Sequence, residues 1–506
     1  MENNLSFFDI IYPKYKIKKP IRLIELFAGY GSQALALKYL GANFEHWKIC
    51  EWAVKSIQAY KDIHFTNINY DFSGNLTKEI LSDILCNLGI SNNYNEPMTK
   101  QQILKINENK LKQIYNNIII TNNLVNIQKV KGKDLEIEEK DKYDYIMTYS
   151  FPCQDLSLAG KGKGMKNTST RSGMLWEVER ILKECNELNA LPQILLMENV
   201  PQVHSKNNIE DFIKWQKSLE TLGYKNYWKD LIATDYGIPQ TRNRCFMISI
   251  LGDYSYSFPS SIPLKLKLKD ILENNVDEKY YLSDKMIRCF TKETNGLYPR
   301  KERFEKSLNK VNKKGIANTI TTLEGSRNIS TYIYIKNNTN KGYLKAKNGD
   351  GIDISSRMEY HRGTVQKDKI QTITTAGGND RGVVVEDSLK RELCNKLIKE
   401  NKVEEYDIVK HSYTQQILNG NKKCVEKNDG NMITLTTRGD CVGTVVKTDN
   451  NLRIRKLTPK ECFRLMGVKD EDYEKCAKNQ SNSSLYHLAG DSIVVNVLMK
   501  IFKEIL

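Results

Sequence analysis

An apolar segment, a glycine turn and a helical segment near the start of the chain constrain the fold more than any other feature. Residues 21–28 (IRLIELFA) are mostly apolar, which is typical of a buried parallel strand. Gly29-Tyr30-Gly31-Ser32 follows, and residues 33–40 then have a helical pattern that ends at Gly41. A strand, a glycine turn and a helix in this order open a doubly wound sheet, so we predict an α/β fold.

The same turn predicts a ligand site. Gly29 and Gly31 let the backbone bend tightly and approach a ligand. Glu51 follows the next predicted strand about 20 residues past the turn, where an acidic side chain accepts hydrogen bonds from ribose hydroxyls. Trp52 can pack against an adenine face. A purely structural glycine turn is the alternative, but the strand, the helix and the acidic residue together favour a cofactor that contains a nucleoside.

The pattern lacks the third glycine of GxGxxG, because Gln33 and Ala34 stand in that region. This absence favours a ligand without a pyrophosphate over a dinucleotide. Asp71 is a candidate for the end of a third strand, where it would contact the adenine amino group. Residues 92–142 are rich in Asn and Lys; we interpret them as an insertion with one amphipathic helix at residues 98–115 and no chemistry.

A cysteine lies just past another predicted strand. Residues 143–148 (YDYIMT) precede Phe151-Pro152-Cys153-Gln154, and a loop rich in Gly and Lys (residues 160–166) follows. Open α/β sheets place their ligands at the carboxyl ends of the strands, and Pro152 stiffens the turn beside the thiol. A lone cysteine is by itself more often structural, so its interpretation depends on the residues near it.

Two further segments bring charged side chains to the same edge of the sheet. Glu198 follows the buried strand predicted for residues 193–197 (QILLM). Arg242 and Arg244 lie between two segments that predict an antiparallel pair, residues 227–234 and 245–251, and strand alternation sends both guanidinium groups to one side. Two such groups on one side favour an anion, although a capping Glu and a pair of surface arginines are the ordinary alternatives.

The composition of the chain indicates what kind of partner it binds and in which compartment it is located. The net charge of +16 and the pI near 9.1 favour a polyanionic partner, although a Lys- and Asn-rich composition inherited from an AT-rich genome would give the same charge. No apolar run approaches the ~20 residues that cross a bilayer, and the N-terminus lacks the pattern of a signal peptide, so we expect a cytoplasmic protein. The 11 cysteines include no CxxC pair and indicate neither a zinc site nor a disulfide framework.

From about Gly252 the chain changes to Thr- and Gly-rich segments that predict β-hairpins. A weak repeat occurs at residues 318–322, 371–375 and 432–437, and the second and third copies precede the Val-rich strands at 381–385 and 442–446. Basic residues flank these segments and suit a phosphate backbone, although a solvated β-domain is the alternative. We predict three parts: residues 1–255, a β region at 256–450, and a return to the first domain at 451–506, where Thr458 caps a helix and Asp491-Ser492 opens the last one.

These segments, in this order, resemble the DNA cytosine-5 methyltransferase family of bacteria and phages. The resemblance spans residues 21–500 except the insertion and the β region, and it rests on seven segments: FAGYGS at Phe27, EW at Glu51, FPCQDLS at Phe151, ENV at Glu198, QTRNR at Gln240, RKLTPKECFRLMGV at Arg455 and AGDSIVV at Ala489. It implies a doubly wound S-adenosylmethionine-dependent methyltransferase sheet with a smaller, mainly β target recognition domain.

The resemblance also implies roles for individual residues. Cys153 is the nucleophile, Glu198 holds the cytosine at N3 and its amino group, and Arg242 and Arg244 hold the target base and its phosphate. The residues implied in S-adenosylmethionine binding are Phe27, Ala28, Gly29, Gly31, Glu51, Trp52, Asp71, Pro152, Leu175, Ser492 and Ile493. The residues expected to contact DNA are Gln154, Ser157, Gln240, Arg362, Arg381 and Arg438. One departure is Asp491, where many members of the family have Asn.

The expected reaction is methylation of C5 of a flipped-out cytosine in duplex DNA, through a covalent bond between Cys153 and C6. The expected partners are a specific DNA site and, for an enzyme of restriction-modification, a cognate endonuclease; we expect a monomer. The alternatives are a tRNA cytosine-5 methyltransferase, a catalytically inactive DNA-binding relative and a nicotinamide-dependent oxidoreductase. The long β region argues against the first, and the last would leave Cys153, Glu198 and Arg242 without roles.

Overall fold

The structure is a computed structural model of the 506-residue chain. It describes residues 12–152, 172–281, 333–339, 343–346, 350–353, 364–373, 381–386, 408–409, 425–426, 443–444 and 452–506. The chain divides into two compact units: Met1–Val276 with Asp368–Arg381 and Leu457–Leu506 form the first, and Asp277–Lys367 with Gly382–Lys456 form the second. The boundaries expected at residues 255 and 450 stay predictions, since much of the second unit lies outside the described residues.

The first unit contains a six-stranded sheet in the order β2-β1-β3-β4-β6-β5. Strands β1 (Ile21–Leu26), β2 (Phe44–Cys50), β3 (Asp144–Tyr149) and β4 (Ile194–Asn199) run parallel. The antiparallel strands β5 (Tyr224–Ile232) and β6 (Asn243–Leu251) complete one side, as the sequence predicts. The parallel strands are buried along their length, β2 only in its last part, which explains their near-continuous apolar sequences.

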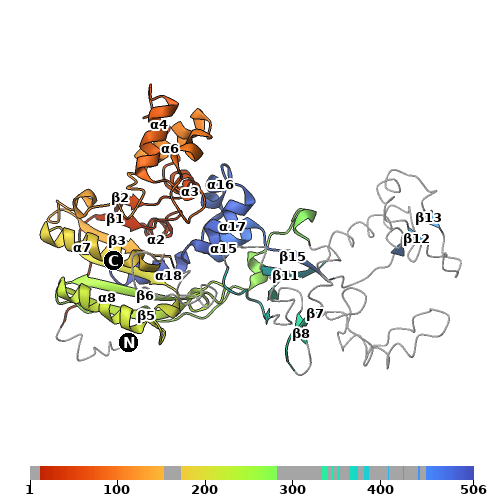
Figure 1. The fold of residues 1–506 in the computed structure, drawn as a ribbon. Helices are drawn as coiled ribbons and strands as arrows, with labels where there is room; N and C mark the ends of the chain where they lie inside the picture. The colour runs from red at the N-terminus through yellow and green to blue at the C-terminus, as the bar shows by residue number, and fades with distance from the viewer. Residues whose placement is uncertain are drawn as a thin grey trace. The chain divides into compact units, whose positions relative to one another are not determined.

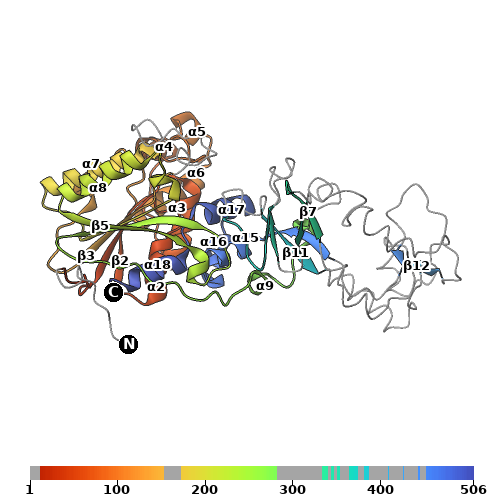
Figure 2. The same ribbon diagram turned by 90° about the horizontal axis from the view of Figure 1, so that it is seen from below.

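Helices cover both faces of this sheet, as a doubly wound fold requires (Figures 1 and 2). In Figure 2, α7 (Leu175–Glu187) and α8 (Ile209–Thr221) lie on one face, and α2 (Ser32–Leu40) and α18 (Val495–Lys503) lie on the other. Helices α2 and α18 pack against each other although they come from opposite ends of the chain. The C-terminal segment therefore completes the fold of the first unit, together with α15 (Pro459–Leu465), α16 (Asp470–Ala477) and α17 (Asn482–Asp491).

The expected insertion at residues 92–142 contributes two α-helices to a helical layer that begins before it in the chain. Helices α4 (Lys78–Leu88), α5 (Lys100–Leu104) and α6 (Glu108–Ile120) pack with α3 (Val54–His64) around a shared apolar cluster. The single helix expected at residues 98–115 is wrong, because the chain breaks between α5 and α6. The Asn107 side chain accepts a hydrogen bond from the backbone N–H of Lys110 and so starts a new helix at that point.

A short segment after α6 lies along the outer edge of β2. Asn123 forms a parallel bridge with Ile49, and the N–H of Leu124 donates to the carbonyl of Ile49 at 2.8 Å. This segment, and not the chain around Asp71, therefore takes the position beside β2. The described residues between α3 and α4 contain no strand, so the expectation that Asp71 ends one is wrong.

The described part of the second unit consists of short strands. A four-stranded sheet has the order β10-β9-β11-β15, in which β11 (Arg381–Glu386) pairs antiparallel with β15 (Leu452–Lys456). Residues 371–373, expected in a hairpin with the strand at 381–385, instead lie against the chain before β6 in the first unit. The first and third copies of the repeat lie outside the described residues. The other short strands are β7 (Ile333–Lys336), β8 (Tyr343–Ala346), β9 (Gly351–Asp353), β10 (Val365–Gln366), β12 (Ile408–Val409), β13 (Val425–Glu426) and β14 (Gly443–Thr444).

The last two helices differ in one respect from the expectation. Asp491 is the final residue of α17 and not a cap at the start of α18, which begins three residues after Ser492. Residues Asn482–Lys503 are long and apolar enough by composition to cross a membrane, and 72% of their most apolar 18-residue stretch is buried inside the protein. Since they form two helices that pack within the first unit, burial in the core accounts for their apolar character.

The two glycines of the turn after β1 predict different effects on stability. A Cβ at Gly31, where φ is +81°, would clash with His64 Nε2 and lie 2.6 Å from the Tyr60 ring; a Cβ at Gly29, where φ is +57°, would meet nothing within 4 Å. We expect Gly31→Ala to lower the free energy of unfolding by about 2–5 kcal/mol and Gly29→Ala by about 1–2 kcal/mol. Denaturant titration of both variants measures the difference, and equal losses would contradict the packing at Gly31.

Candidate active site

The glycine turn holds the first part of the candidate site. The backbone N–H groups of Phe27 and Ala28 both donate to the carbonyl of Cys50, so the ends of β1 and β2 are joined directly. Phe27 has a φ of 59°, Gly29 of 57° and Gly31 of 81°. This left-handed backbone produces the sharp turn from β1 into α2 that the glycines predict.

Glu51 lies at the end of β2, next to this turn. Its side chain is buried; one carboxylate oxygen accepts from the N–H of Gly29 at 2.9 Å and the other from the N–H of Ala53 at 2.7 Å. Burial raises the pKa of Glu51 to about 7, and the two N–H donors oppose that rise. Each oxygen accepts one of these backbone donors and keeps capacity for another donor, such as a sugar hydroxyl.

Two residues that the sequence did not single out support Glu51 and the turn. The Asn123 side chain accepts from the N–H of Glu51 at 3.0 Å and donates to its carbonyl at 2.9 Å. Glu25, within β1, accepts from the N–H of Ala34 in the first turn of α2 and from the Tyr60 hydroxyl. In the sequence, Glu25 appears only as an acidic residue inside a strand that is apolar apart from it and Arg22.

The other expected cofactor residues lie in three different surroundings. Ser492 and Ile493 reach the glycine turn: the Tyr30 hydroxyl donates to Ser492 Oγ at 2.8 Å, and the N–H of Ile493 donates to Ser32 Oγ at 3.3 Å. Trp52 is half-buried against the helical cluster. Leu175 belongs to the large apolar core of the sheet, and Phe27 packs against that core. Pro152 directly precedes Cys153 in the sequence.

Asp71 lies in an exposed loop and contacts Ser73 in the same loop and Asn116 in α6. Its carboxylate accepts from the Ser73 hydroxyl and backbone N–H and from the Asn116 side chain, and these bonds lower its pKa to about 2. Asp71 thus stabilises its loop and joins it to α6. Asp491, the departure from the family pattern, has a carboxylate oxygen 3.0 Å from Nδ1 of His487, and the His487 ring stacks on Tyr94 with centroids 4.1 Å apart.

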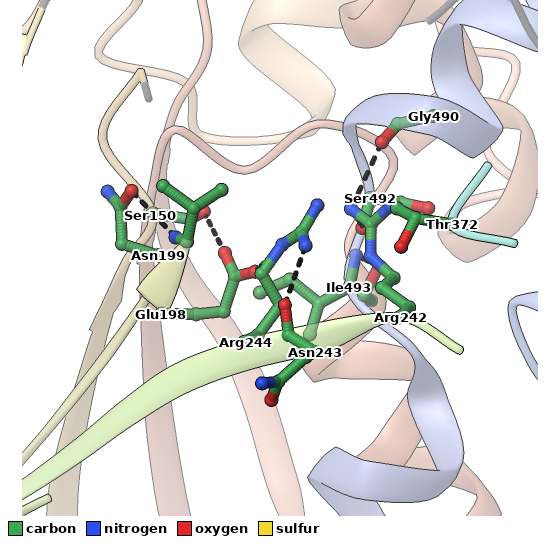
Figure 3. Close-up of polar contacts among 12 residues, drawn as sticks. Ser150, Glu198, Asn199, Arg242, Asn243, Arg244, Thr372, Gly490, Ser492 and Ile493 are labelled. Carbon is green, nitrogen blue, oxygen red and sulfur yellow. Dashed lines mark hydrogen bonds and ion pairs between the residues drawn. The ribbon is translucent and has the colours of Figure 1, made fainter. Parts of the chain in front are cut away.

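Glu198 is the centre of the second part of the site (Figure 3). It follows the apolar part of β4 and is 5% exposed. One oxygen accepts from the Ser150 hydroxyl at 2.5 Å, and the other lies 3.1 Å from Nε of Arg244. The donors on both sides fix the orientation of the carboxyl group. A residue that binds a substrate in one geometry needs such a fixed orientation.

Cys153, Gln154 and Ser157 lie outside the described residues, but the two residues before the cysteine are described. The Asn199 side chain donates to the carbonyl of Phe151 at 2.9 Å. Asn199 directly follows Glu198 on β4, so this bond holds the chain that leads into Pro152 and Cys153 beside the end of β4. The structure therefore places Phe151 beside Asn199, the residue after Glu198; the position of Cys153 at the same edge stays a prediction.

Arg242 and Arg244 differ in their partners. Arg244 faces Glu198, whereas Arg242 is 4% exposed and donates to three backbone carbonyls, those of Ile373, Gly490 and Ser492 (Figure 3). Among these contacts of described residues, Arg242 and Arg244 do not share one anion, although their predicted position on one side of the strand suggested that they would. Alternation along a strand predicts the side of a residue but not what packs against it.

The expected DNA contacts receive little support from the described residues. Gln240 is fully buried: its amide donates to the carbonyl of Leu465 at 2.8 Å and accepts from the N–H of Ile373 at 2.9 Å. Both ends of the side chain are therefore used inside the protein, so a direct contact of Gln240 with DNA is a wrong expectation. Arg362 and Arg438 lie outside the described residues; Arg381 begins β11, and only its backbone is described.

One group of described residues has the side chains of a metal site. Ligand atoms of His204, Asp230 and Cys245 lie within 4.8 Å of one another. His204 Nε2 lies 2.9 Å from an oxygen of Asp230, which is a hydrogen bond that joins the segment after β4 to β5. This bond accounts for the proximity of the His and Asp side chains, and the reaction expected here uses neither.

Comparisons with known proteins support the family resemblance. Residues 86–506 match the family model described as C-5 cytosine-specific DNA methylase. The chain is 30% identical over 489 residues to the type II methyltransferase M2.ScrFI of Lactococcus lactis subsp. cremoris, which covers 96% of this chain and 99% of the relative. It is 38% identical over 271 residues to the orphan methyltransferase M.SssI of Spiroplasma monobiae, covering 53% and 68% of the two chains. Among solved structures, the Entamoeba histolytica methyltransferase EhMeth is similar with a TM-score of 0.49 and 12% identity, over 96% of this chain and 98% of that one.

Proposed function

Because this chain belongs to the C-5 cytosine-specific DNA methylase family, we propose that Cys153, Glu198 and Arg244 carry out methyl transfer from S-adenosylmethionine to C5 of a cytosine in duplex DNA. The observation that carries this proposal is the carboxyl group of Glu198, held between Ser150 and Arg244 beside the chain that leads into Cys153. A cytosine that enters this edge of the sheet would meet an oriented carboxyl group and a guanidinium group, and Cys153 directly follows the described Pro152 in the sequence.

Each residue type suits its step. C5 of cytosine is a poor nucleophile, and a thiolate that adds to C6 turns the ring into an enamine with electron density at C5. Negative charge builds on the ring as the sulfur–carbon bond forms, and Glu198 neutralises it by sharing a proton with N3. Arg244 keeps the carboxyl group in place and adds positive charge near the ring. C5 would then take the methyl group from the sulfonium sulfur, which leaves as a neutral thioether. Loss of the C5 proton to solvent and departure of the Cys153 thiolate from C6 restore the aromatic ring.

The cofactor site would be formed by the glycine turn, Glu51, Ser492 and Ile493. S-adenosylmethionine supplies the methyl group on a sulfonium sulfur, where it is strongly electrophilic. Gly29 brings the backbone close to the ligand, and Glu51 accepts hydrogen bonds from the ribose hydroxyls. The remaining acceptor capacity on both Glu51 oxygens supports this assignment.

The raised pKa of Glu51 makes cofactor binding depend on pH. In the free protein the group is partly protonated at pH 7, so folding favours its neutral form; this contribution to stability is complete below the ordinary pKa of 4.5 and is lost as the pH rises through about 7. Ribose hydroxyls and a cationic ligand favour the ionised form. We therefore expect binding at pH 7 to release a fraction of a proton, and affinity to fall as the pH drops below about 7.

Calorimetry in two buffers with different ionisation enthalpies measures this proton release. Glu51→Gln should bind S-adenosylmethionine more weakly and release no proton from this position. Glu25→Gln is the matched control, because burial also raises the pKa of Glu25 to about 7 while the group bonds to α2 and Tyr60 instead of the cofactor. Proton uptake by the unaltered protein, or unchanged release in Glu51→Gln, would remove Glu51 from the ribose site.

The substrate is tested directly in cells and in solution. Sequencing methylated DNA from a bacterial host that expresses the protein should show 5-methylcytosine in one sequence context. Transfer of a labelled methyl group to duplex DNA and not to tRNA excludes the RNA-methylating alternative, and the opposite preference would overturn the proposal. We also propose that the protein is a monomer, that it is located in the cytoplasm and that it has a cognate restriction endonuclease. Light scattering of the purified protein tests whether it is a monomer.

A further inference from the structure

The segment between the two parts of the second unit docks into the first unit. Asp368–Arg381 belongs to the first unit, while the chain enters the second unit on either side of it. The N–H of Ile370 donates to the carbonyl of Pro239, and the N–H of Thr241 donates to the carbonyl of Ile370, both at 2.9 Å. Gln240, fully buried, receives the N–H of Ile373 on its amide oxygen. Residues 370–373 are thus held in the core by the chain just before β6.

Arg242 joins this segment to the C-terminal part of the unit. Its Nη1 donates to the carbonyl of Ile373 at 2.9 Å, and its Nη2 donates to those of Gly490 and Ser492 at 3.0 and 2.7 Å (Figure 3). A buried guanidinium group requires such partners, because removing a charge from water is costly. One rigid, planar side chain therefore connects two segments that lie more than a hundred residues apart in the sequence.

The contacts continue from Ser492 to the glycine turn. Ser492 Oγ accepts from the Tyr30 hydroxyl at 2.8 Å, and the N–H of the next residue, Ile493, donates to Ser32 Oγ at 3.3 Å. Tyr30 lies between Gly29 and Gly31. The hydrogen bonds therefore form an unbroken series from Ile373 through Arg242 and Ser492 to the turn after β1.

We propose that Arg242 is a positioning residue that couples DNA binding by the second unit to cofactor binding at the glycine turn. This inference rests on the proposed function, in which the second unit reads the DNA and the turn binds S-adenosylmethionine. A duplex that orders residues 370–373 would, through Arg242, order Ser492 and the turn. Coupling of this kind is reciprocal, so the cofactor would tighten DNA binding by the same factor.

The test measures the affinity of the full chain for S-adenosylhomocysteine, which permits no turnover. Calorimetry is done alone and with saturating duplex that carries the methylated sequence found in the expressing host. In the unaltered protein the duplex should raise the affinity about 5- to 150-fold, the usual range of coupling between two sites. Arg242→Lys should bring this ratio to within about twofold of one, because an ammonium group cannot reproduce a planar fork with two donor arms.

Two further variants keep the result interpretable. Arg180→Lys is the control, since Arg180 also bonds backbone carbonyls of the first unit, those of Ile127 and Val130, but stands outside the series of bonds from Ile373 to the glycine turn; its ratio should equal that of the unaltered protein. Tyr30→Phe removes only the hydroxyl that bonds Ser492 and should lower the ratio even if Arg242→Lys fails to fold.

The outcomes separate the inference from the proposed function. A protein that neither binds S-adenosylhomocysteine nor methylates DNA would overturn the proposed function. A protein that does both, but whose affinity is the same with and without duplex, would overturn the coupling. The coupling through Arg242 is equally wrong if folded Arg242→Lys and Tyr30→Phe retain the full ratio.

Discussion

Cys153→Ser should reduce methyl transfer at least about a thousandfold while binding of DNA and cofactor persists. A serine hydroxyl ionises at far higher pH than a thiol and is a much weaker nucleophile toward C6 of cytosine. Three of the described cysteines offer no substitute: burial raises the pKa of Cys50, Cys245 and Cys476 far above the ordinary value of a thiol, which keeps those groups protonated. Transfer of a labelled methyl group to duplex DNA measures the loss.

A duplex that contains 5-fluorocytosine in place of the target base adds a second measurement. The unaltered protein should form an adduct with it that survives denaturation, because fluorine at C5 blocks the step that releases the sulfur; Cys153→Ser should form none. Cys86→Ser, a change in the partly exposed cysteine of α4, should retain both activity and adduct. If Cys153→Ser loses affinity for DNA and cofactor alike, the cysteine is structural and not the nucleophile.

Glu198→Gln should lower kcat by about 10²- to 10⁴-fold with little change in the KM for the cofactor. Glutamine has nearly the same shape but cannot supply a proton to N3 of the target cytosine. It also leaves Arg244, whose side chain is only 16% exposed, without its ion-pair partner at 3.1 Å. Single-turnover transfer at saturating DNA and cofactor isolates the chemical step.

Ser150→Ala is the matched comparison for Glu198→Gln. It removes one hydrogen bond to the same carboxyl group and preserves the acid itself. Loss of a bond worth about 1 kcal/mol corresponds to a decrease in kcat of roughly fivefold, well below that of Glu198→Gln. Equal effects of the two changes would mean that Glu198 acts through its orientation of the loop and not as the acid.

The elements of the sheet could be predicted because their signals are local. The apolar runs before Gly29, Cys153 and Glu198 all form buried parallel strands. The two segments on either side of Arg242 form the expected antiparallel pair, β5 and β6. The insertion and the recognition region gave weaker signals. Their polar residues follow no clear period, so the break between α5 and α6 and the docking of residues 371–373 were not visible in the pattern.

The sequence by itself determined which residues stand at the carboxyl edge of the sheet. Parallel strands end at one edge, so the order of strand, turn and helix brings Glu51, Glu198 and the chain before Cys153 to that edge without any knowledge of packing. Only the tertiary structure decided what each neighbouring side chain touches. Arg242 lies two residues from Arg244, yet it bonds carbonyls 131 to 250 positions away, whereas Arg244 bonds Glu198. Alternation along a strand specifies a direction, and the partner in that direction depends on segments that only the folded chain brings together.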